Sequence, residues 1–188
     1  METVDFTRLG GGACAEISDC IAKIDSLQVR AMVRTIAGAR RIALYGVGRE
    51  GLMMKALAMR LYHLGLDAHV VGDMSTPALG SGDLLLVSAG PGMFSTVAAL
   101  VGVAKEAGAA SACFTAQPDA QVPMMCDNVM VLPAQTMAND TGADTSILPM
   151  GSLYEGVQFV AFEILVLMLA DHLDVSASAM RARHTNLE

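Results

Sequence analysis

Two short glycine-rich segments are the parts of this sequence whose residue types and spacing could do chemistry. The first, Tyr45-Gly46-Val47-Gly48-Arg49-Glu50-Gly51, follows the apolar run 41–44, and the second, Ser88-Ala89-Gly90-Pro91-Gly92-Met93-Phe94-Ser95, follows the apolar run 84–87. A strand that ends in Gly-x-Gly and enters a helix presents backbone N–H groups and a positive helix end to a ligand. The glycines therefore predict a ligand site, although neither turn carries the hydroxyl side chains usually aimed at a phosphate.

Short apolar strands alternate with helical segments around these turns. Strands are expected at 41–45, 67–71, 83–88, 109–115 and 127–132, and helices at 49–64, 93–107 and 150–173, after a leading helical segment at 14–37 that breaks near Asp25. This alternation predicts an α/β fold, a parallel sheet covered by helices on both faces. Ligands in such sheets bind beyond the carboxyl ends of the strands. Both glycine turns and the long loop 133–148 leave that edge, so three loops are expected to converge on one crevice.

Composition excludes several classes of protein. The chain has 188 residues, 53% of them apolar, and a net charge of −7 with no basic run, so nucleic acid is not an expected partner. The first twelve residues hold no apolar h-region, and the longest apolar stretch, 157–170, is too short for a bilayer and predicts a core helix. Four cysteines without Cys-x-x-Cys spacing indicate reduced thiols in the cytoplasm. No metal site or cofactor is expected, because the four histidines lie far apart.

Several stretches together resemble one family over nearly the whole chain. They are Gly46-Val47-Gly48-Arg49, Met59-Arg60-Leu61-Tyr62-His63-Leu64-Gly65, Val71-Gly72, Thr76-Pro77, Gly82-Asp83-Leu84-Leu85, Leu148-Pro149-Met150-Gly151 with Glu155, and Arg183-His184-Thr185-Asn186-Leu187. The chain resembles the sugar isomerase (SIS) domain family, and within it the 6-phospho-3-hexuloisomerases.

The resemblance implies a fold, an assembly and a reaction. The fold is a single three-layer domain with a five-stranded parallel sheet of flavodoxin-like order: a leading segment 1–40, a core 41–132, an active-site loop 133–149, and a long helix with tail at 150–188. The assembly is a homotetramer or dimer with sites at subunit contacts. The reaction is a ketose–ketose isomerisation through an enediol.

Two residues carry catalytic roles by this resemblance. Glu155 matches the family's base, and His184 matches a tail histidine that reaches a neighbouring subunit's site. A carboxylate near a helix start is stabilised as an anion, while partial burial raises its pKa toward that of a useful base. The alternatives are a first-turn acid without chemistry for Glu155 and a subunit-contact residue for His184. His63 is expected to pack between helix and sheet, without a catalytic role.

The sequence departs from the family at the phosphate-binding positions. The family's first turn reads Gly-x-Gly-Arg-Ser-Gly and its second Ser-Gly-Ser-Gly-x-Thr; the matching hydroxyl positions here are Glu50, Ala89, Pro91 and Phe94. Losing four hydrogen bonds to a charged group weakens phosphate binding by about 6 kcal/mol on an additive count. Phosphate bound in the family's usual way is therefore not expected.

Three interpretations remain open for the ligand. The first is a sugar isomerase whose substrate lacks the terminal phosphate, with Glu50 accepting hydrogen bonds from sugar hydroxyls and Phe94 packing on a sugar face. The second is a phosphohexulose isomerase whose anion site is rebuilt on Arg49 and backbone donors, unless Arg49 merely pairs with Glu50. The third is a non-catalytic protein that binds a carbohydrate derivative. The expected substrate-binding residues are Gly46, Gly48, Arg49, Glu50, Ser88, Ala89, Gly90, Gly92, Phe94 and Ser95.

Overall fold

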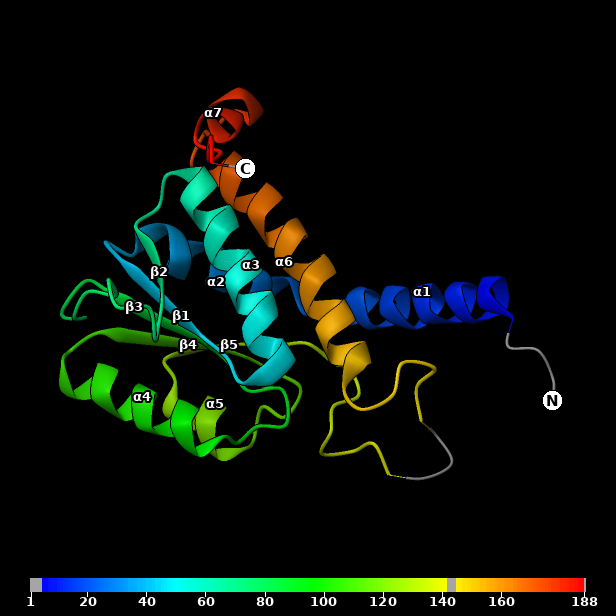
Figure 1. Ribbon diagram of the computed structural model, residues 1–188. Helices are drawn as coiled ribbons and strands as arrows, with labels where there is room; N and C mark the ends of the chain where they lie inside the picture. Colours follow the sequence, from blue (N-terminus) through cyan, green and yellow to red (C-terminus); the bar gives the residue numbers. More distant parts are fainter. Residues whose placement is uncertain (1–4, 142–144, 188) are drawn as a thin grey trace.

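A five-stranded parallel sheet forms the centre of the computed structural model, which describes residues 5–141 and 145–187. Its strands are β1 (Ile42–Tyr45), β2 (Ala68–Val70), β3 (Leu84–Ser88), β4 (Ala110–Thr115) and β5 (Asn128–Val131), in the spatial order β2-β1-β3-β4-β5. This order confirms the predicted flavodoxin-like sheet (Figure 1). The strand order reverses between β1 and β3, which is where ligands bind in open α/β sheets.

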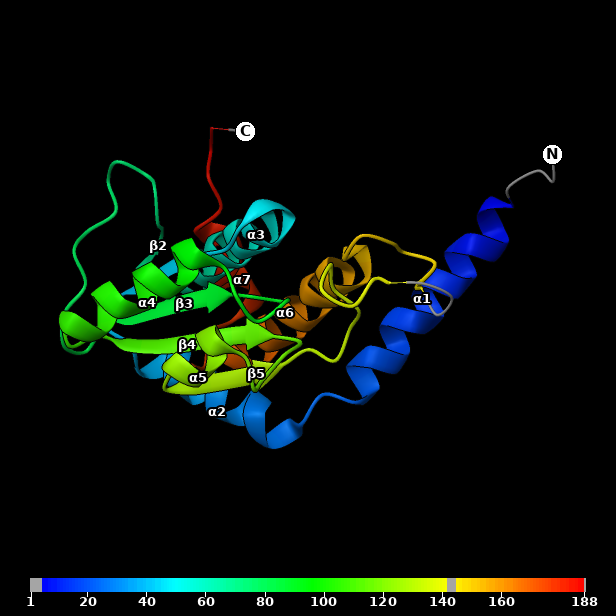
Figure 2. The same ribbon diagram turned by 90° about the horizontal axis from the view of Figure 1, so that it is seen from below.

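Helices cover both faces of the sheet and make three layers (Figures 1 and 2). One apolar core lies under α2 (Ser26–Gly38), α3 (Gly48–Leu64) and α6 (Ser152–His172), and a second lies under α4 (Ser95–Glu106) and α5 (Gln121–Met125). The remaining helices are α1 (Phe6–Ala22) and α7 (Ala177–Ala182). The central strand β3 is buried along its whole length, as expected for a strand with helices on both sides.

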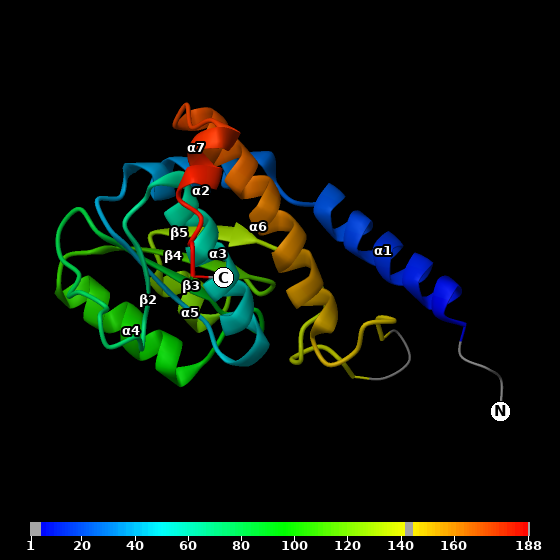
Figure 3. The same cartoon turned by 45° about the horizontal axis from the view of Figure 1, so that its top comes forward.

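The leading segment is broken near Asp25 as predicted and forms two helices, α1 and α2. Helix α1 starts earlier than predicted, at Phe6, where the Asp5 carboxylate accepts hydrogen bonds from the N–H groups of Thr7 and Arg8. Asp25 caps α2 in the same way, by accepting from the N–H of Leu27 at 2.7 Å. An N-cap aspartate starts a new helix, so the break is a boundary between two separately capped helices. The amino-terminal half of α1 projects from the body (Figure 3).

Helix α6 confirms the predicted helix at 150–173 and extends beyond the apolar stretch 157–170 at both ends. Its 21 residues are long and apolar enough to cross a membrane by length and composition alone, and half of that window is buried inside the chain. The buried side packs against α1, α2 and α3. Three large apolar side chains remain on its other side: Phe159, Ile164 and Leu167. A helix that is apolar all round is one whose outer side also needs cover.

Candidate active site

Strand register brings the two glycine turns to the same point of the sheet edge. Tyr45 at the end of β1 pairs with Val87 in β3, so Gly46, which follows β1, and Ser88, the last residue of β3, lie side by side at the sheet edge. The amino-terminal end of α6 lies over both turns, because its residues contact each of them. The two glycine turns therefore converge as predicted, beside the start of α6. The third expected partner, the loop 133–148, lies in part (142–144) outside the described residues.

The first turn needs glycine for its close backbone approach. A Cβ atom on Gly51 would lie 2.4 Å from the carbonyl oxygen of Gly46, which no side chain allows. Gly48 begins α3 with φ of +59°, a left-handed conformation that favours glycine. The turn therefore enters α3 tightly and directs two consecutive side chains, Arg49 and Glu50, to different sides of the helix.

A buried carboxylate connects the first turn to the second. Glu50 is only 6% exposed, and its Oε2 accepts hydrogen bonds from Ser88 Oγ at 2.5 Å and from the N–H of Gly90 at 2.9 Å. Burial raises the pKa of the Glu50 carboxyl above its ordinary value, and these two hydrogen bonds lower it in part. The sequence predicted that this carboxylate accepts hydrogen bonds from sugar hydroxyls. In the structure its Oε2 accepts hydrogen bonds from the protein itself.

Two residues of α6 complete this network. Gln158 is fully buried and donates from Nε2 to Ser88 Oγ at 2.8 Å, and the Tyr154 hydroxyl lies 3.4 Å from the same Oγ. Burial, together with the nearby Glu50 carboxylate, raises the pKa of Tyr154 well above its ordinary value, so its hydroxyl stays protonated. Within the described part of the chain, Gln158 Oε1 is buried without a hydrogen-bond partner.

The second turn is shaped around that network. A Cβ on Gly90 would lie 2.8 Å from Tyr154 Cε1 and 2.9 Å from Glu50 Oε1, so this position has no room for a side chain. Gly92 adopts a φ of +87° and packs against Gln117 and Ala120. Both glycines predicted to bind substrate therefore have a structural reason to be glycine.

Arg49 reaches across to the start of α6. Its Nη1 donates to Ser152 Oγ at 2.7 Å, and its Nη2 donates to the carbonyl oxygen of Met150. Nη2 also lies 3.1 Å from Glu155 Oε2. The pairing of Arg49 with Glu50 that the sequence left open does not form, because the two side chains leave α3 in different directions. The same guanidinium is largely occupied by the protein itself, although half of the side chain is exposed.

Glu155 combines partial burial with a cationic neighbour. Its side chain is 16% exposed, and its Oε2 is buried with the Arg49 guanidinium as ion-pair partner, at an angle that is not that of a hydrogen bond. Burial raises the pKa of the Glu155 carboxyl, while Arg49 lowers it and Glu50 adds a smaller increase. A carboxylate of raised pKa in a crevice is suited to act as a general base.

The other predicted residues of the second turn contribute less to the crevice. Ala89 is fully buried, and Phe94 packs partly into the core under α4, so the protein itself contacts the ring that was expected on a sugar face. Ser95 is the first residue of α4 and is exposed. The first turn also lines a cavity of about 200 Å³ beside β2, whose walls include Gly46, Gly48 and Lys55.

His184 is not close to Glu155 of its own chain. Helices α3 and α6 run parallel, since Arg49 meets Ser152 at one end and Arg60 meets Glu163 further along. Glu163 lies eight residues beyond Glu155, which is about 12 Å along a helix. His184 lies further still.

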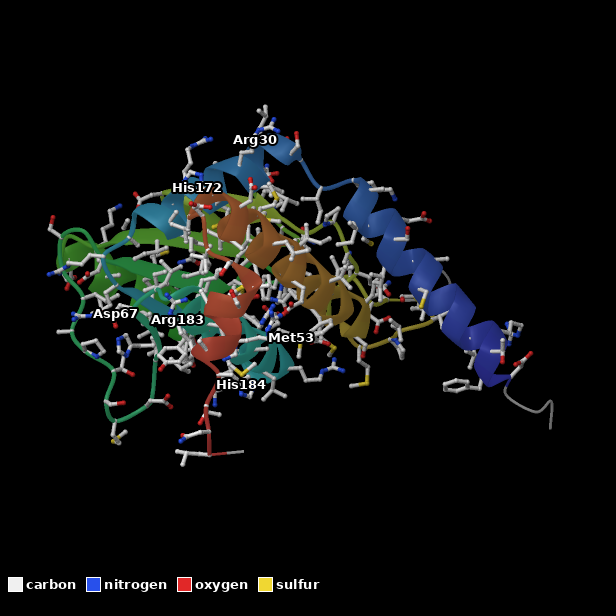
Figure 4. The ribbon with its side chains drawn as sticks, turned by 90° about the horizontal axis from the view of Figure 1, so that it is seen from above. Arg30, Met53, Asp67, His172, Arg183 and His184 are labelled. Atoms are coloured by element: carbon white, nitrogen blue, oxygen red, sulfur yellow. The ribbon has the colours of Figure 1, made fainter. Side chains whose placement is uncertain are left out.

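The tail rests on the far end of α3. The His184 ring stacks on His63 with centroids 5.3 Å apart. Arg183 Nη1 donates to the carbonyl oxygen of His63 at 3.1 Å. Figure 4 labels Arg183 and His184 where α7 leads into the tail, at the end of α3 opposite the glycine turns in Figure 1. His63 is buried as expected, but its ring contact with His184 was not predicted.

Sequence reasoning missed the α6 side of the site. Gln158 lies within the apolar stretch 157–170 that was predicted to be a core helix, and Tyr154 lies in the same predicted helix, 150–173, without an assigned role. The signal that could have found Gln158 is its polar amide inside the apolar stretch 157–170, in which Glu163 is the only other polar residue. The loop before α6 is also fixed locally, because the Met150 N–H donates to Asp140 Oδ2 at 2.5 Å. In the described ranges no cluster of three His, Cys, Asp or Glu side chains could hold a metal ion.

Comparison with known proteins agrees with this architecture. The SIS domain model matches residues 35–155. The chain is 43% identical over 173 residues to a 3-hexulose-6-phosphate isomerase from Mycobacterium gastri, covering 92% of this chain and 86% of that protein. It is 30% identical to the protein of the same name from Bacillus subtilis, covering 92% and 94%. A crystal structure from Methanococcus jannaschii superposes with a TM-score of 0.82 at 24% identity, covering 95% and 98%.

Proposed function

Since the chain belongs to the SIS domain family, we propose that it is a sugar isomerase that moves a proton between adjacent carbons of a ketose through an enediol, with Glu155 as the base. The relatives named 3-hexulose-6-phosphate isomerase support a hexulose as the substrate class. The observation that carries the proposal is the position of Glu155, partly buried beside Arg49 at the start of α6, where both glycine turns end.

In the proposed reaction each group has a role. The Glu155 carboxylate removes a proton from the hydroxyl-bearing carbon beside the carbonyl; the C–H electron pair forms the enediol double bond, and the π pair of the carbonyl moves to its oxygen. The hydroxyl proton then passes from the neighbouring oxygen to this oxygen and a new carbonyl forms on the first carbon, while the Glu155 carboxylic acid returns its proton to the former carbonyl carbon. Negative charge develops on the substrate oxygens in between. Because Glu155 is then protonated and no longer neutralises Arg49, the positive charge of the Arg49 guanidinium, 3.1 Å from Glu155, stabilises this developing negative charge.

We further propose that the group facing the two turns is not a phosphate bound in the family's usual way. The side chains at the four expected hydroxyl positions cannot donate to it: Glu50, Ala89, Pro91 and Phe94. An anion site rebuilt on Arg49 is not favoured, because Ser152, Met150 and Glu155 already occupy its guanidinium.

The tail and the outer side of α6 support an assembly. His184 is remote from Glu155 within one chain, so a catalytic His184 requires a second subunit. Large apolar side chains lie exposed on neighbouring helices: Leu52, Met59 and Tyr62 on α3, and Phe159, Ile164 and Leu167 on α6. An apolar surface of this kind typically marks a protein contact. We propose that a second copy of the chain covers it.

An isomerase assay with a matched variant tests the reaction. Ketose substrates with and without a terminal phosphate are offered to wild type, to Glu155→Gln and to Glu163→Gln, whose carboxylate pairs with Arg60 two turns along α6. We expect Glu155→Gln to lose 10²–10⁴-fold in kcat and Glu163→Gln to keep its activity. Sugar binding without turnover in wild type would favour a non-catalytic protein instead.

A further inference from the structure

We propose that the Glu50 carboxylate fills the anion position between the two glycine turns, and that Glu50 is thereby the residue that selects against a phosphate in this crevice. This inference rests on the proposed function, because it concerns which sugar the same crevice accepts. It predicts a binding property that can be measured without any turnover.

The backbone N–H groups of the second turn are already used within the protein. A glycine turn at a strand end binds an anion through its backbone N–H groups. Here the N–H of Gly90 donates to Glu50 Oε2, the N–H of Gly92 donates to the carbonyl oxygen of Ala89, and Pro91 has no N–H. Three consecutive positions of the turn therefore offer no donor to a ligand while Glu50 stays in place.

The side-chain hydrogen bonds around Ser88 point toward Glu50. Ser88 Oγ receives a hydrogen bond from Gln158 Nε2, so its own proton is free to point at Glu50 Oε2, 2.5 Å away. Two donors, Ser88 Oγ on β3 and the N–H of Gly90 in the second turn, therefore reach Glu50 Oε2 directly. Gln158 on α6 orients the first of them. An ionised oxyanion is the acceptor that this arrangement fits, and the carboxylate of Glu50 supplies it from inside the chain.

The second turn leaves no space beside Glu50. Gly90 is held between the Tyr154 ring and Glu50 Oε1, and a Cβ atom on Gly90 would lie less than 3 Å from each of them. A phosphate at Ser88 and Gly90 would have to take the place of the carboxylate and would otherwise face a like charge. Either displacement or protonation of Glu50 is required before an anion can enter.

Few other groups around Glu50 can change charge between pH 5 and 8. Its neighbours are Arg49 on α3, Tyr154 and Glu155 on α6, and Cys113 on β4. Burial raises the pKa of Tyr154, and contact with Cys126 together with burial raises that of Cys113, so both stay neutral. Among these four neighbours only Glu155 has a carboxyl group. The variant Glu155→Gln removes that carboxyl group and so separates its titration from that of Glu50.

Sulfate binding is the direct test, because the charge of sulfate is constant over this pH range. Titration calorimetry compares wild type with Glu50→Ser, Glu50→Gln and the distant control Glu163→Gln. At pH 7.5 we expect Glu50→Ser to bind sulfate and fructose 6-phosphate at least tenfold more tightly than wild type, and Glu163→Gln to match wild type. Wild type should bind sulfate more tightly as the pH falls, both alone and with Glu155→Gln added, whereas Glu50→Gln should show no such change.

The outcomes separate this inference from the proposed function. Equal sulfate affinity in wild type, Glu50→Ser and Glu50→Gln would overturn it, even if Glu155→Gln had abolished turnover. Conversely, the expected sulfate results would stand if no ketose were isomerised. A thermal melt of each variant precedes the titrations, and Glu50→Gln, which keeps the shape of the side chain, provides the comparison if Glu50→Ser does not fold.

Discussion

Arg49 on α3 and Glu155 on α6 form an ion pair at the point where the two parallel helices begin, with Nη2 and Oε2 3.1 Å apart. The pair joins the first glycine turn to the proposed base. Half of the Arg49 side chain is exposed, so the pair itself contributes little to stability. The pair matters because it sets the charge state of Glu155: burial raises the pKa of this carboxyl and Arg49 lowers it.

Arg49→Ala should move the pH dependence of catalysis. Without the guanidinium the pKa of Glu155 rises further, because burial is no longer opposed, and the carboxylate needed as base forms only at higher pH. We expect the acidic limb of the kcat/KM profile to shift to higher pH and activity at pH 7 to fall by about tenfold or more. Arg60→Ala, which removes the pair with Glu163, is the control and should leave the profile in place.

Glu50→Gln should stabilise the protein in a pH-dependent manner. The pKa of Glu50 is higher in the folded than in the unfolded chain, so the folded chain holds this proton more tightly. The carboxyl's contribution to stability is therefore complete below the unfolded pKa and is lost as the pH rises through the folded pKa. Urea unfolding at pH 4 and pH 8 should show that the unfolding free energy of Glu50→Gln, relative to that of wild type, increases with rising pH. A difference that does not vary with pH would contradict the burial of an ionisable Glu50.

Gly90→Ala should damage the site by sterics alone. Its added methyl group would lie within 3 Å of both Tyr154 and Glu50, which are buried and held by hydrogen bonds. We expect a loss of about 1–3 kcal/mol in unfolding free energy, measured by urea denaturation, together with loss of turnover. Gly102→Ala in α4 is the matched control: nothing lies within 4 Å of its Cβ position, so it should gain about 0.5–1 kcal/mol.

Phe159→Arg should break the proposed subunit contact. Phe159 is 55% exposed on α6 within the single chain, so the arginine fits an isolated subunit but not an apolar interface. Light scattering after size-exclusion chromatography should show a smaller particle than wild type. Met124→Arg, at an exposed residue on α5 across the sheet, should keep the size of wild type. A monomeric wild type would contradict the proposed assembly.

Two inactive variants should restore activity when mixed if sites are shared between subunits. Glu155→Gln lacks the base, and His184→Ala lacks the tail ring that stacks on His63. Co-expressed subunits would form some sites with Glu155 from one chain and His184 from another, so a fraction of wild-type turnover should return. If His184→Ala alone is fully active, the ring packs the tail and has no part in the reaction.

The sequence by itself was sufficient to predict the parallel sheet and the two glycine turns that meet at its edge. The apolar runs 41–44 and 84–87 and the glycine turns that follow them obey local rules: buried parallel strands are continuously apolar, and a strand-to-helix turn needs glycine at positions such as Gly48. The family resemblance added the strand order, which the structure confirms.

Only the tertiary structure decided where the side chains of the turns point. Arg49 and Glu50 are neighbours in sequence, yet one reaches α6 at the surface and the other is buried against the second turn, because successive residues of a helix face different directions. Glu50 meets Ser88, 38 residues away, and Ser88 meets Gln158, 70 residues away. No local pattern encodes such distances. They arise when β1 and β3 pair in register and α6 closes over both turns, and this packing converts a glycine turn that could bind an anion into one that already holds a carboxylate.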